Sequence, residues 1–239
     1  MKPAIVVTGA SSEIGHELAR VAAREGFVML LLGRSQEALD DLVAELRSSA
    51  VEAHAFSVDI AGLDAGQLVE NKLAEVDVSC DGLVNSAGFG VFGAAAESNR
   101  EEHLKLIDVN IRALTDLTLR FLPGMIARRR GGVLNVGSIT AYTPGPNMAT
   151  YYASKAYVNS FTAALAAEVS GTGVTVTCLS PGVVRTAFFG RSAVAQTRLF
   201  KLAPRSNAPE TAETGWRGFR AGKRLVIPRL INRMAACVL

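Results

Sequence analysis

Several features that define other protein classes are scarce or absent in this chain. Its 239 residues include only three cysteines and three histidines, and none of these has the spacing of a metal site. No uncharged apolar stretch approaches the ~20 residues that a membrane-spanning helix needs. The apolar run at Ala4–Val7 is too short for the core of a signal peptide. We therefore expect a cytoplasmic protein with reduced thiols, no integral membrane segment and no metal.

Charge of one sign is also limited. The formal net charge is +3 and charged residues make up 20% of the chain, too little for the concentrated basic field of a nonspecific nucleic-acid binder. The basic cluster Arg128–Arg130 precedes Gly131-Gly132, as is typical of a helix C-terminus. We expect no nucleic-acid partner. With 49% hydrophobic residues, the chain has the composition and length of one domain over residues 1–239.

What the sequence does contain is an alternation of short apolar runs with longer segments of helical character. The runs are Ile5–Val7, Phe27–Leu32, Ala53–Val58, Leu83–Asn85, Val133–Val136, Val174–Leu179 and Leu225–Ile227. The helical segments are Ile14–Glu25, Gln36–Ser48, Asp64–Glu75, Glu102–Arg129, Tyr151–Val169 and Pro209–Arg220. This alternation predicts an α/β fold, a doubly wound Rossmann-type parallel sheet of about seven strands with helices on both faces. The aperiodic stretch Arg185–Asn207 is predicted to be a substrate loop.

The first strand leads into a glycine-containing turn, Thr8-Gly9-Ala10-Ser11-Ser12-Glu13-Ile14-Gly15, directly before the first helix. Backbone N–H groups and the positive end of a helix attract an anion such as a pyrophosphate. Glycines also occur at ordinary strand-to-helix turns, so the motif alone leaves both interpretations open.

The second strand is followed by Gly33-Arg34, where dinucleotide-binding folds that prefer NAD usually have an acidic residue. Glycine leaves space there, and the guanidinium of Arg34 can bind the 2′-phosphate of NADP(H). We therefore favour NADP(H) over NAD(H). The alternative is that Arg34 is a solvated charge at the start of a helix.

Tyr151 and Lys155 are four positions apart and therefore lie on one face of the predicted helix. A phenol with an ordinary pKa near 10 is a weak base, but an adjacent ammonium group favours its phenolate. Ser138, at the end of the fifth strand, can bring a hydroxyl to the same place. Such a tyrosine–lysine pair also occurs by chance as an exposed pair without chemistry. Tyr152 lacks the offset from Lys155 and is expected to face packing or solvent.

In this order, the motifs resemble those of the short-chain dehydrogenase/reductase family. Its first turn reads Thr-Gly-x-x-x-Gly-x-Gly, and its catalytic pattern is a serine followed by Tyr-x-x-x-Lys. Gly9 and Gly15 match the outer two glycines, whereas Glu13 stands in the place of the middle one. We expect the Glu13 carboxylate to point to solvent, where the first helical turn also favours a negative charge.

The resemblance extends to the rest of the cofactor site. Asp59-Ile60 matches the adenine contact, and Asn85-Ser86-Ala87-Gly88 matches Asn-Asn-Ala-Gly with one change, although Asp59 and Asn85 could instead close a turn and a strand. Pro181–Thr186 implies contact of the Val184 main chain and the Thr186 hydroxyl with the nicotinamide carboxamide, although it could be a plain turn. The full set of expected cofactor-binding residues is Gly9, Ser11, Ser12, Ile14, Gly15, Arg34, Asp59, Ile60, Asn85, Ala87, Gly88, Tyr151, Lys155, Pro181, Gly182, Val184 and Thr186.

The resemblance implies hydride transfer between NADP(H) and a small-molecule carbonyl or alcohol substrate. Tyr151 would be the acid or base, Ser138 would orient the substrate oxygen, and Asn110 would support a proton relay from Lys155. It also implies a homodimer or homotetramer built on the helices at 102–129 and 151–169. Alternatives are a sensor or scaffold protein that binds NADP(H) without turnover, and an epimerase or dehydratase of the extended branch. The latter is disfavoured because we find no additional C-terminal domain.

Overall fold

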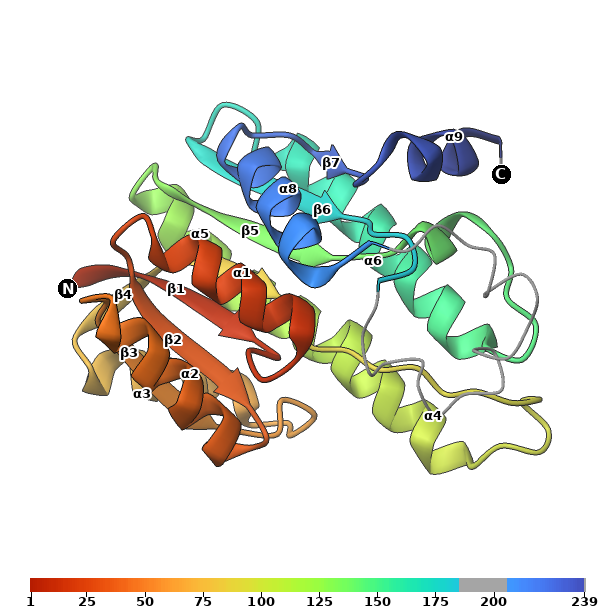
Figure 1. The fold of residues 1–239 in the computed structure, drawn as a ribbon, viewed down its shortest axis with the longest axis horizontal. Coiled ribbons are helices and arrows are strands. Elements are labelled where there is room, and N and C mark those ends of the chain that lie inside the picture. The colour runs from red at the N-terminus through yellow and green to blue at the C-terminus, as the bar shows by residue number, and fades with distance from the viewer. Residues whose placement is uncertain (185–205, 239) are drawn as a thin grey trace.

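The computed structural model describes residues 1–184 and 206–238, with side chains up to Met234. Seven parallel strands form one sheet in the order β3-β2-β1-β4-β5-β6-β7 (Figure 1). The strands are β1 (Lys2–Thr8), β2 (Val28–Gly33), β3 (Ala53–Ser57), β4 (Val78–Asn85), β5 (Gly131–Val136), β6 (Val174–Leu179) and β7 (Leu225–Val226).

The order of the strands reverses between β1 and β4, and this places a crevice at their carboxyl ends. In the sheet register, Thr8 at the end of β1 is level with Leu32 of β2 and with Asn85 of β4. Asn85 is in turn level with Asn135 of β5. The turns that follow these four strands therefore lie along one edge of the sheet.

Helices cover both faces of the sheet, and each face has its own apolar core. The helices α1 (Glu13–Ala23), α2 (Gln36–Ser48) and α8 (Ala208–Arg220) pack on one face. The helices α3 (Ala65–Glu75), α5 (Leu114–Ala127) and α6 (Ala149–Glu168) pack on the other. Alternate residues of β1 enter different cores, Val6 on the α5 side and Val7 on the α1 side. The predicted fold class is confirmed.

The segment expected to be one helix over 102–129 is interrupted, and this corrects the prediction. It consists of α4 (Arg100–Ile107), a π-helical turn η1 (Asp108–Ala113) and α5. Such turns hold an additional residue and occur frequently at functional sites. Here the turn contains Asn110, whose side chain is buried and bonded to segments on either side. Apolar periodicity continues through the turn and does not reveal it.

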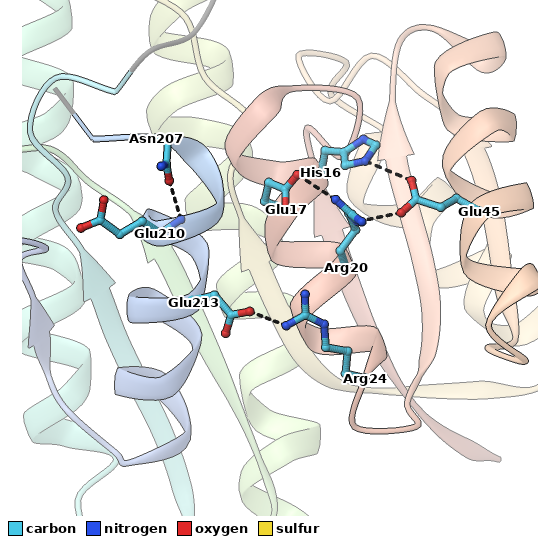
Figure 2. A network of polar contacts seen from close by, with 8 residues as sticks. All are labelled: His16, Glu17, Arg20, Arg24, Glu45, Asn207, Glu210 and Glu213. Carbon is cyan, nitrogen blue, oxygen red and sulfur yellow. Dashed lines mark hydrogen bonds and ion pairs between the residues drawn. The ribbon is translucent and has the colours of Figure 1, made fainter.

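Ion pairs connect α1 to its neighbours α2 and α8 (Figure 2). Arg20 Nε of α1 is 2.6 Å from Glu45 Oε1 of α2, and Arg24 of α1 pairs with Glu213 of α8. Trp216 of α8 adds a buried anchor, since its Nε1 donates to Glu25 Oε1 at 2.6 Å. Exposed ion pairs contribute little individually, so the packing of α1 rests mainly on its apolar face.

The expected substrate loop at 185–207 lies outside the described residues except for its last two positions. Its flanks meet at an isolated parallel bridge between Val184 and Ser206, where Ser206 N donates to Val183 O at 2.9 Å. Beyond β7, a further helix, α9 (Leu230–Val238), lies near the short 3-10 helix η2 (Ile139–Tyr142).

Candidate active site

The glycine-containing turn after β1 is built by close approaches between backbone segments. Gly9 has a φ of 66°, and a Cβ there would lie 2.8 Å from Ala87 Cα. A Cβ on Gly15 would lie 2.2 Å from Gly9 O. The turn therefore packs directly against the Ala87 backbone, and α1 starts directly against the turn. This is the geometry that lets a main chain approach a pyrophosphate closely.

Two hydroxyl groups hold this arrangement. Ser12 is the N-cap of α1, and its Oγ donates to Gly9 O at 2.6 Å. Thr8 Oγ1 accepts from Ser86 N and Ala87 N, both at 3.1 Å. The Thr8 hydroxyl therefore joins the turn after β1 to the turn after β4. We did not single out Thr8 from the sequence, although it stands directly before Gly9 in the motif.

A pocket opens at this edge of the sheet. Of the expected cofactor-binding residues it is lined by Gly9, Ser11, Ser12, Arg34, Asp59, Ile60, Ala87 and Gly88, together with Leu32, Gly33, Val58, Phe89 and Val109. Ile14 and Gly15 belong to the first turn of α1 behind it. The close backbone approach at Gly9 and Gly15, here called the glycine cradle, and the lining residues from four strand ends fit the adenosine and pyrophosphate parts of a dinucleotide.

Glu13, which replaces the middle glycine of the family motif, is exposed and is not part of the pocket lining. It is the first residue of α1, where the helix dipole favours a carboxylate. The Glu13 carboxylate is therefore not among the groups that line the pocket beside Gly9.

Arg34 and Asp59 face the same end of the pocket. A Cβ on Gly33, the residue before Arg34, would lie 2.8 Å from Ser11 Oγ. The Ser11 hydroxyl therefore occupies the space beside Gly33. Partial burial acts to raise the pKa of Asp59, but the Ala61 N–H, Lys105 and Arg34 outweigh it and lower that pKa. Lys105 Nζ lies 3.1 Å from Asp59 Oδ2. This contact crosses from α4 to the turn after β3 and has no signal in the sequence.

The Asn85 side chain is not in the pocket, although we expected it among the cofactor-binding residues. Its Nδ2 donates to Thr118 Oγ1 at 3.1 Å and to Asn135 Oδ1 at 2.9 Å. Asn135 Nδ2 in turn donates to Thr162 Oγ1 at 3.0 Å. These buried amides and hydroxyls connect β4, β5, α5 and α6 inside the fold. The Asn85 side chain therefore has a structural role behind the turn that follows β4.

The chemical end of the site gathers Ser138, Tyr151 and Lys155, all of them buried. Tyr151 and Lys155 lie on the inner face of α6, with Lys155 Nζ 5.8 Å from the centroid of the Tyr151 ring. Lys155 Nζ donates to Val136 O at 2.8 Å, two residues before Ser138 at the end of β5. The three side chains expected from the sequence are therefore brought together.

Burial sets the protonation behaviour of this group. It raises the pKa of Tyr151 to about 12, while hydrogen bonding with Ser138 opposes this rise and the proximity of Tyr152 adds to it. Burial lowers the pKa of Lys155 to about 8, with a small opposing effect of Cys178. Tyr151 is thus a neutral phenol near neutral pH, beside a lysine that exchanges its proton easily.

Asn110 connects the π-helical turn to α6. Its Oδ1 accepts from Phe89 N at 3.1 Å, and its Nδ2 donates to Ser154 Oγ at 3.0 Å. Ser154 Oγ then donates to Tyr151 O at 2.7 Å. Asn110 also lies against Gly88, where a Cβ would be 3.1 Å from its Oδ1. These bonds link the turn after β4 to the backbone of Tyr151.

The segment after β6 approaches the same site. Pro181 O accepts from Ile139 N at 3.0 Å, and a Cβ on Gly182 would lie 2.6 Å from Asn232 Oδ1 of α9. Val184 is buried, and Thr186 lies outside the described residues.

Tyr152, the competing tyrosine, packs edge-on against Tyr151 with ring centroids 6.1 Å apart. A Cβ on Gly145 would meet its ring at 2.3 Å.

No described helix is both long and apolar enough to cross a membrane. Across residues 1–184 and 206–234, no three His, Cys, Asp or Glu side chains gather as they would around a metal ion. Cys80 and Cys178 are buried free thiols.

Comparison with known proteins identifies the family of the chain. The family model for short chain dehydrogenases matches residues 3–196. The chain belongs to the short-chain dehydrogenase family. It is an enzyme of the NAD(P)-dependent oxidoreductase type that defines this family.

Individual members of the short-chain dehydrogenase family are similar over most of the chain. Sulfoacetaldehyde reductase 2 of Chromohalobacter salexigens is 35% identical over 190 residues, which is 79% of this chain and 75% of the relative. The fatty acyl-CoA reductase of Acinetobacter baylyi is 32% identical over 211 residues, 87% of this chain and 70% of the relative. A short-chain dehydrogenase from Sphingobium yanoikuyae, solved in complex with NADPH, superposes with a TM-score of 0.87 at 30% identity, covering 99% of this chain and 92% of that one.

Proposed function

We propose that this enzyme is an NADP(H)-dependent oxidoreductase that reduces the carbonyl group of a small molecule or oxidises the corresponding alcohol, with Tyr151 as its acid or base. The observation that carries the proposal is the buried group of Ser138, Tyr151 and Lys155 at the strand edge that also holds the glycine cradle. Catalysis of this kind needs a proton donor and a nucleotide site next to each other.

NADP(H), when bound, supplies hydride transfer to or from the substrate carbon. The residues named above from Gly9 to Gly88 would hold its adenosine and pyrophosphate parts, and the segment Pro181–Val184 would approach the nicotinamide. Arg34 is placed to bind the 2′-phosphate, since its side chain carries a guanidinium group and it lines the pocket together with Asp59.

Side chains of the protein carry out the proton transfer. The Ser138 hydroxyl binds the substrate oxygen, and the neutral Tyr151 phenol donates its proton to that oxygen during reduction. The nearby Lys155 ammonium stabilises the resulting phenolate. Because the pKa of Lys155 is lowered to about 8, this lysine can release a proton toward the phenolate and recover it from solvent near neutral pH. Asn110 holds the Tyr151 backbone in place through Ser154.

The relatives widen the range of substrates to be tested. They include reductases named for sulfoacetaldehyde and for fatty acyl-CoA, so aldehydes and acyl thioesters join ketones as candidates. We further propose that the chain is a single domain and a cytoplasmic homodimer or homotetramer. Leu119 and Ile126, partly exposed on α5, support an oligomer contact on that helix.

The test of cofactor preference is a fluorescence titration with NADPH and NADH. The wild type should bind NADPH more tightly, and Arg34→Ala should weaken NADPH binding roughly tenfold or more while leaving NADH binding nearly unchanged. Arg100→Ala, which removes an exposed arginine paired with Glu101, is the matched control. Equal weakening of both nucleotides, or of neither, would contradict the role of Arg34.

A panel of aldehydes, ketones and acyl thioesters with NADPH then tests the reaction. Turnover of at least one carbonyl class is expected. Tight binding of NADPH with no turnover of any class would favour the sensor or scaffold alternative. Failure to bind either nucleotide would defeat the proposed function.

A further inference from the structure

The helix α9 follows β7 and lies beside the segment that comes after β6 (Figure 1). The pairing of β6 with β7 continues past the end of β6, since Ser180 N donates to Val226 O at 2.8 Å. Ser180 directly precedes the segment Pro181–Val184, and α9 begins at Leu230, four residues after Val226. The start of α9 is therefore close to the start of that segment.

Two side-chain contacts hold α9 on the rest of the fold. Arg233 Nε donates to Ile227 O at 3.0 Å, just beyond β7. Arg229 Nε, directly before the helix, lies 3.7 Å from Glu210 Oε1 of α8. The first turn of α9 is thus attached to the end of β7 and to α8, and its position is defined relative to the sheet.

Asn232 is a polar residue of α9 that is turned toward the protein. Its exposed fraction is 5%, whereas the apolar side chains of Ile231 and Met234 are 52% and 61% exposed. Its Nδ2 donates to Pro228 O at 2.9 Å, and this bond fixes the orientation of the amide. A buried polar side chain on a helix with exposed apolar neighbours indicates a specific contact.

The Asn232 amide lies directly against Gly182. A Cβ added at Gly182 would lie 2.6 Å from Asn232 Oδ1, 2.7 Å from its Nδ2 and 2.8 Å from its Cγ. These three nearest atoms all belong to one side chain, so Asn232 fills the space that a larger residue would need. The neighbouring Pro181 O accepts from Ile139 N of η2 at 3.0 Å. The segment is therefore held by η2 at Pro181 and by α9 at Gly182.

This segment connects α9 to the chemical end of the site. In the proposed function, Pro181–Val184 approaches the nicotinamide, and η2 directly follows Ser138, which binds the substrate oxygen. Hydride transfer requires the nicotinamide to lie at a set distance from the substrate carbon, and a displacement of about 1 Å can cost a large part of the rate. A side chain that fixes this segment therefore affects the reaction from outside the site.

We propose that Asn232 is a positioning residue, which packs against Gly182, holds Pro181–Val184 against η2 and thereby sets the place of the nicotinamide half of NADP(H). The effect on the cofactor rests on the proposed function. The contact between α9 and Gly182 does not, because residues of this chain alone make it. Asn232 acts through Gly182.

The first experiment tests the contact by thermal denaturation without any nucleotide. Gly182→Ala should lower the midpoint by about 3–6 °C, because the new methyl group meets the buried Asn232 amide. In the background of Asn232→Ala, which removes the amide, Gly182→Ala should lower it by no more than about 1 °C. The background of Ile231→Ala, on the outer face of α9, is the matched control and should leave the full effect.

An equal loss from Gly182→Ala in the wild-type and Asn232→Ala backgrounds would overturn the proposal, since the two residues would then act independently. The absence of any loss in the wild-type background would also overturn it, because the amide would then not fill the space beside Gly182.

The second experiment compares the binding of NADPH with that of 2′,5′-ADP, which has the adenosine and the 2′-phosphate but no nicotinamide. Gly182→Ala should weaken NADPH binding about fivefold or more and leave 2′,5′-ADP binding within about twofold. Adding Asn232→Ala should restore NADPH binding to the level of Asn232→Ala alone.

Equal weakening of NADPH and 2′,5′-ADP would overturn the positioning role, because the defect would not be at the nicotinamide. Failure of the wild type to bind either ligand would defeat the proposed function and this role with it, while the denaturation experiment would still decide whether Asn232 contacts Gly182.

Discussion

The nucleotide turn at Gly9 and the tyrosine site at Ser138, Tyr151 and Lys155 lie along the same edge of the sheet but are held by different forces. At the nucleotide turn, backbone segments touch, and the space that a Cβ would need is filled by Ala87 and by Gly9 itself. At the tyrosine site, polar side chains are buried, and their pKa values are displaced by burial. The first region depends on close packing of the main chain, and the second on electrostatics.

This difference determines which kind of amino-acid substitution each region tolerates. A methyl group added at the nucleotide turn meets backbone atoms that cannot move independently, so its effect is steric and reaches the stability of the fold. At the tyrosine site a change of similar size can keep the packing and remove only a proton or a charge. The two regions should therefore separate into variants that lose stability and variants that lose chemistry.

The largest effect is expected for Tyr151→Phe, which removes the proton donor and keeps the ring. We predict a decrease in kcat for carbonyl reduction of about 10²–10⁴-fold, with NADPH binding and thermal stability close to those of the wild type. Steady-state kinetics and a fluorescence titration measure these quantities. Tyr152→Phe is the control and should stay active. Retained activity in Tyr151→Phe would show that another group transfers the proton.

Gly15→Ala is expected to act on stability. The new Cβ would lie 2.2 Å from Gly9 O, a backbone atom. Displacement of the turn should lower the free energy of unfolding by about 1–3 kcal/mol and weaken NADPH binding. Urea denaturation provides the measurement. Gly124→Ala in α5 is the control, since its Cβ would meet only the end of the Arg128 side chain and should stabilise the helix by up to about 1 kcal/mol.

A small loss of stability in Gly15→Ala with normal NADPH binding would contradict a role for close backbone packing at this turn, because the turn would then be able to relax.

Lys155→Met should lose activity and gain stability, the reverse of a packing defect. The pKa of Lys155 is lowered from 10.5 to about 8 in the folded protein. The unfolded chain therefore binds more protons between these two values. The buried lysine costs stability below the folded pKa, and the cost fades as the pH rises toward 10.5. At neutral pH the variant should be more stable by about 2 kcal/mol, after the lost bond to Val136 O is allowed for.

The measurement is urea denaturation from about pH 7 to about pH 10, and the advantage of Lys155→Met should shrink over that range. Lys223→Met, at an exposed lysine beyond α8, should show no such trend. A constant difference across the range would mean that Lys155 is not held with a lowered pKa.

Much of the fold could be predicted from the sequence, because the relevant patterns are local. The apolar run Phe27–Leu32 and its neighbours predicted a parallel sheet, and β2 (Val28–Gly33) covers all but the first residue of that run. The offset of Tyr151 from Lys155 predicted a shared helical face, which α6 provides. The π-helical turn around Asn110 could not be predicted, since it interrupts no periodicity and serves contacts with Phe89 and Ser154.

The features of the site also divide into those that the sequence predicted and those that it did not. The residue types and their order along the chain were enough to single out the glycine turn, Arg34 and the group of Ser138, Tyr151 and Lys155 as candidates, because each motif is a short local sequence. Only the tertiary structure decided that the Asn85 amide turns inward to Thr118 and that the Thr8 hydroxyl joins two turns. These partners are 33 and 79 positions apart. Sequence determines which groups a segment carries, whereas the packing of the sheet and helices determines which distant groups come within hydrogen-bonding distance.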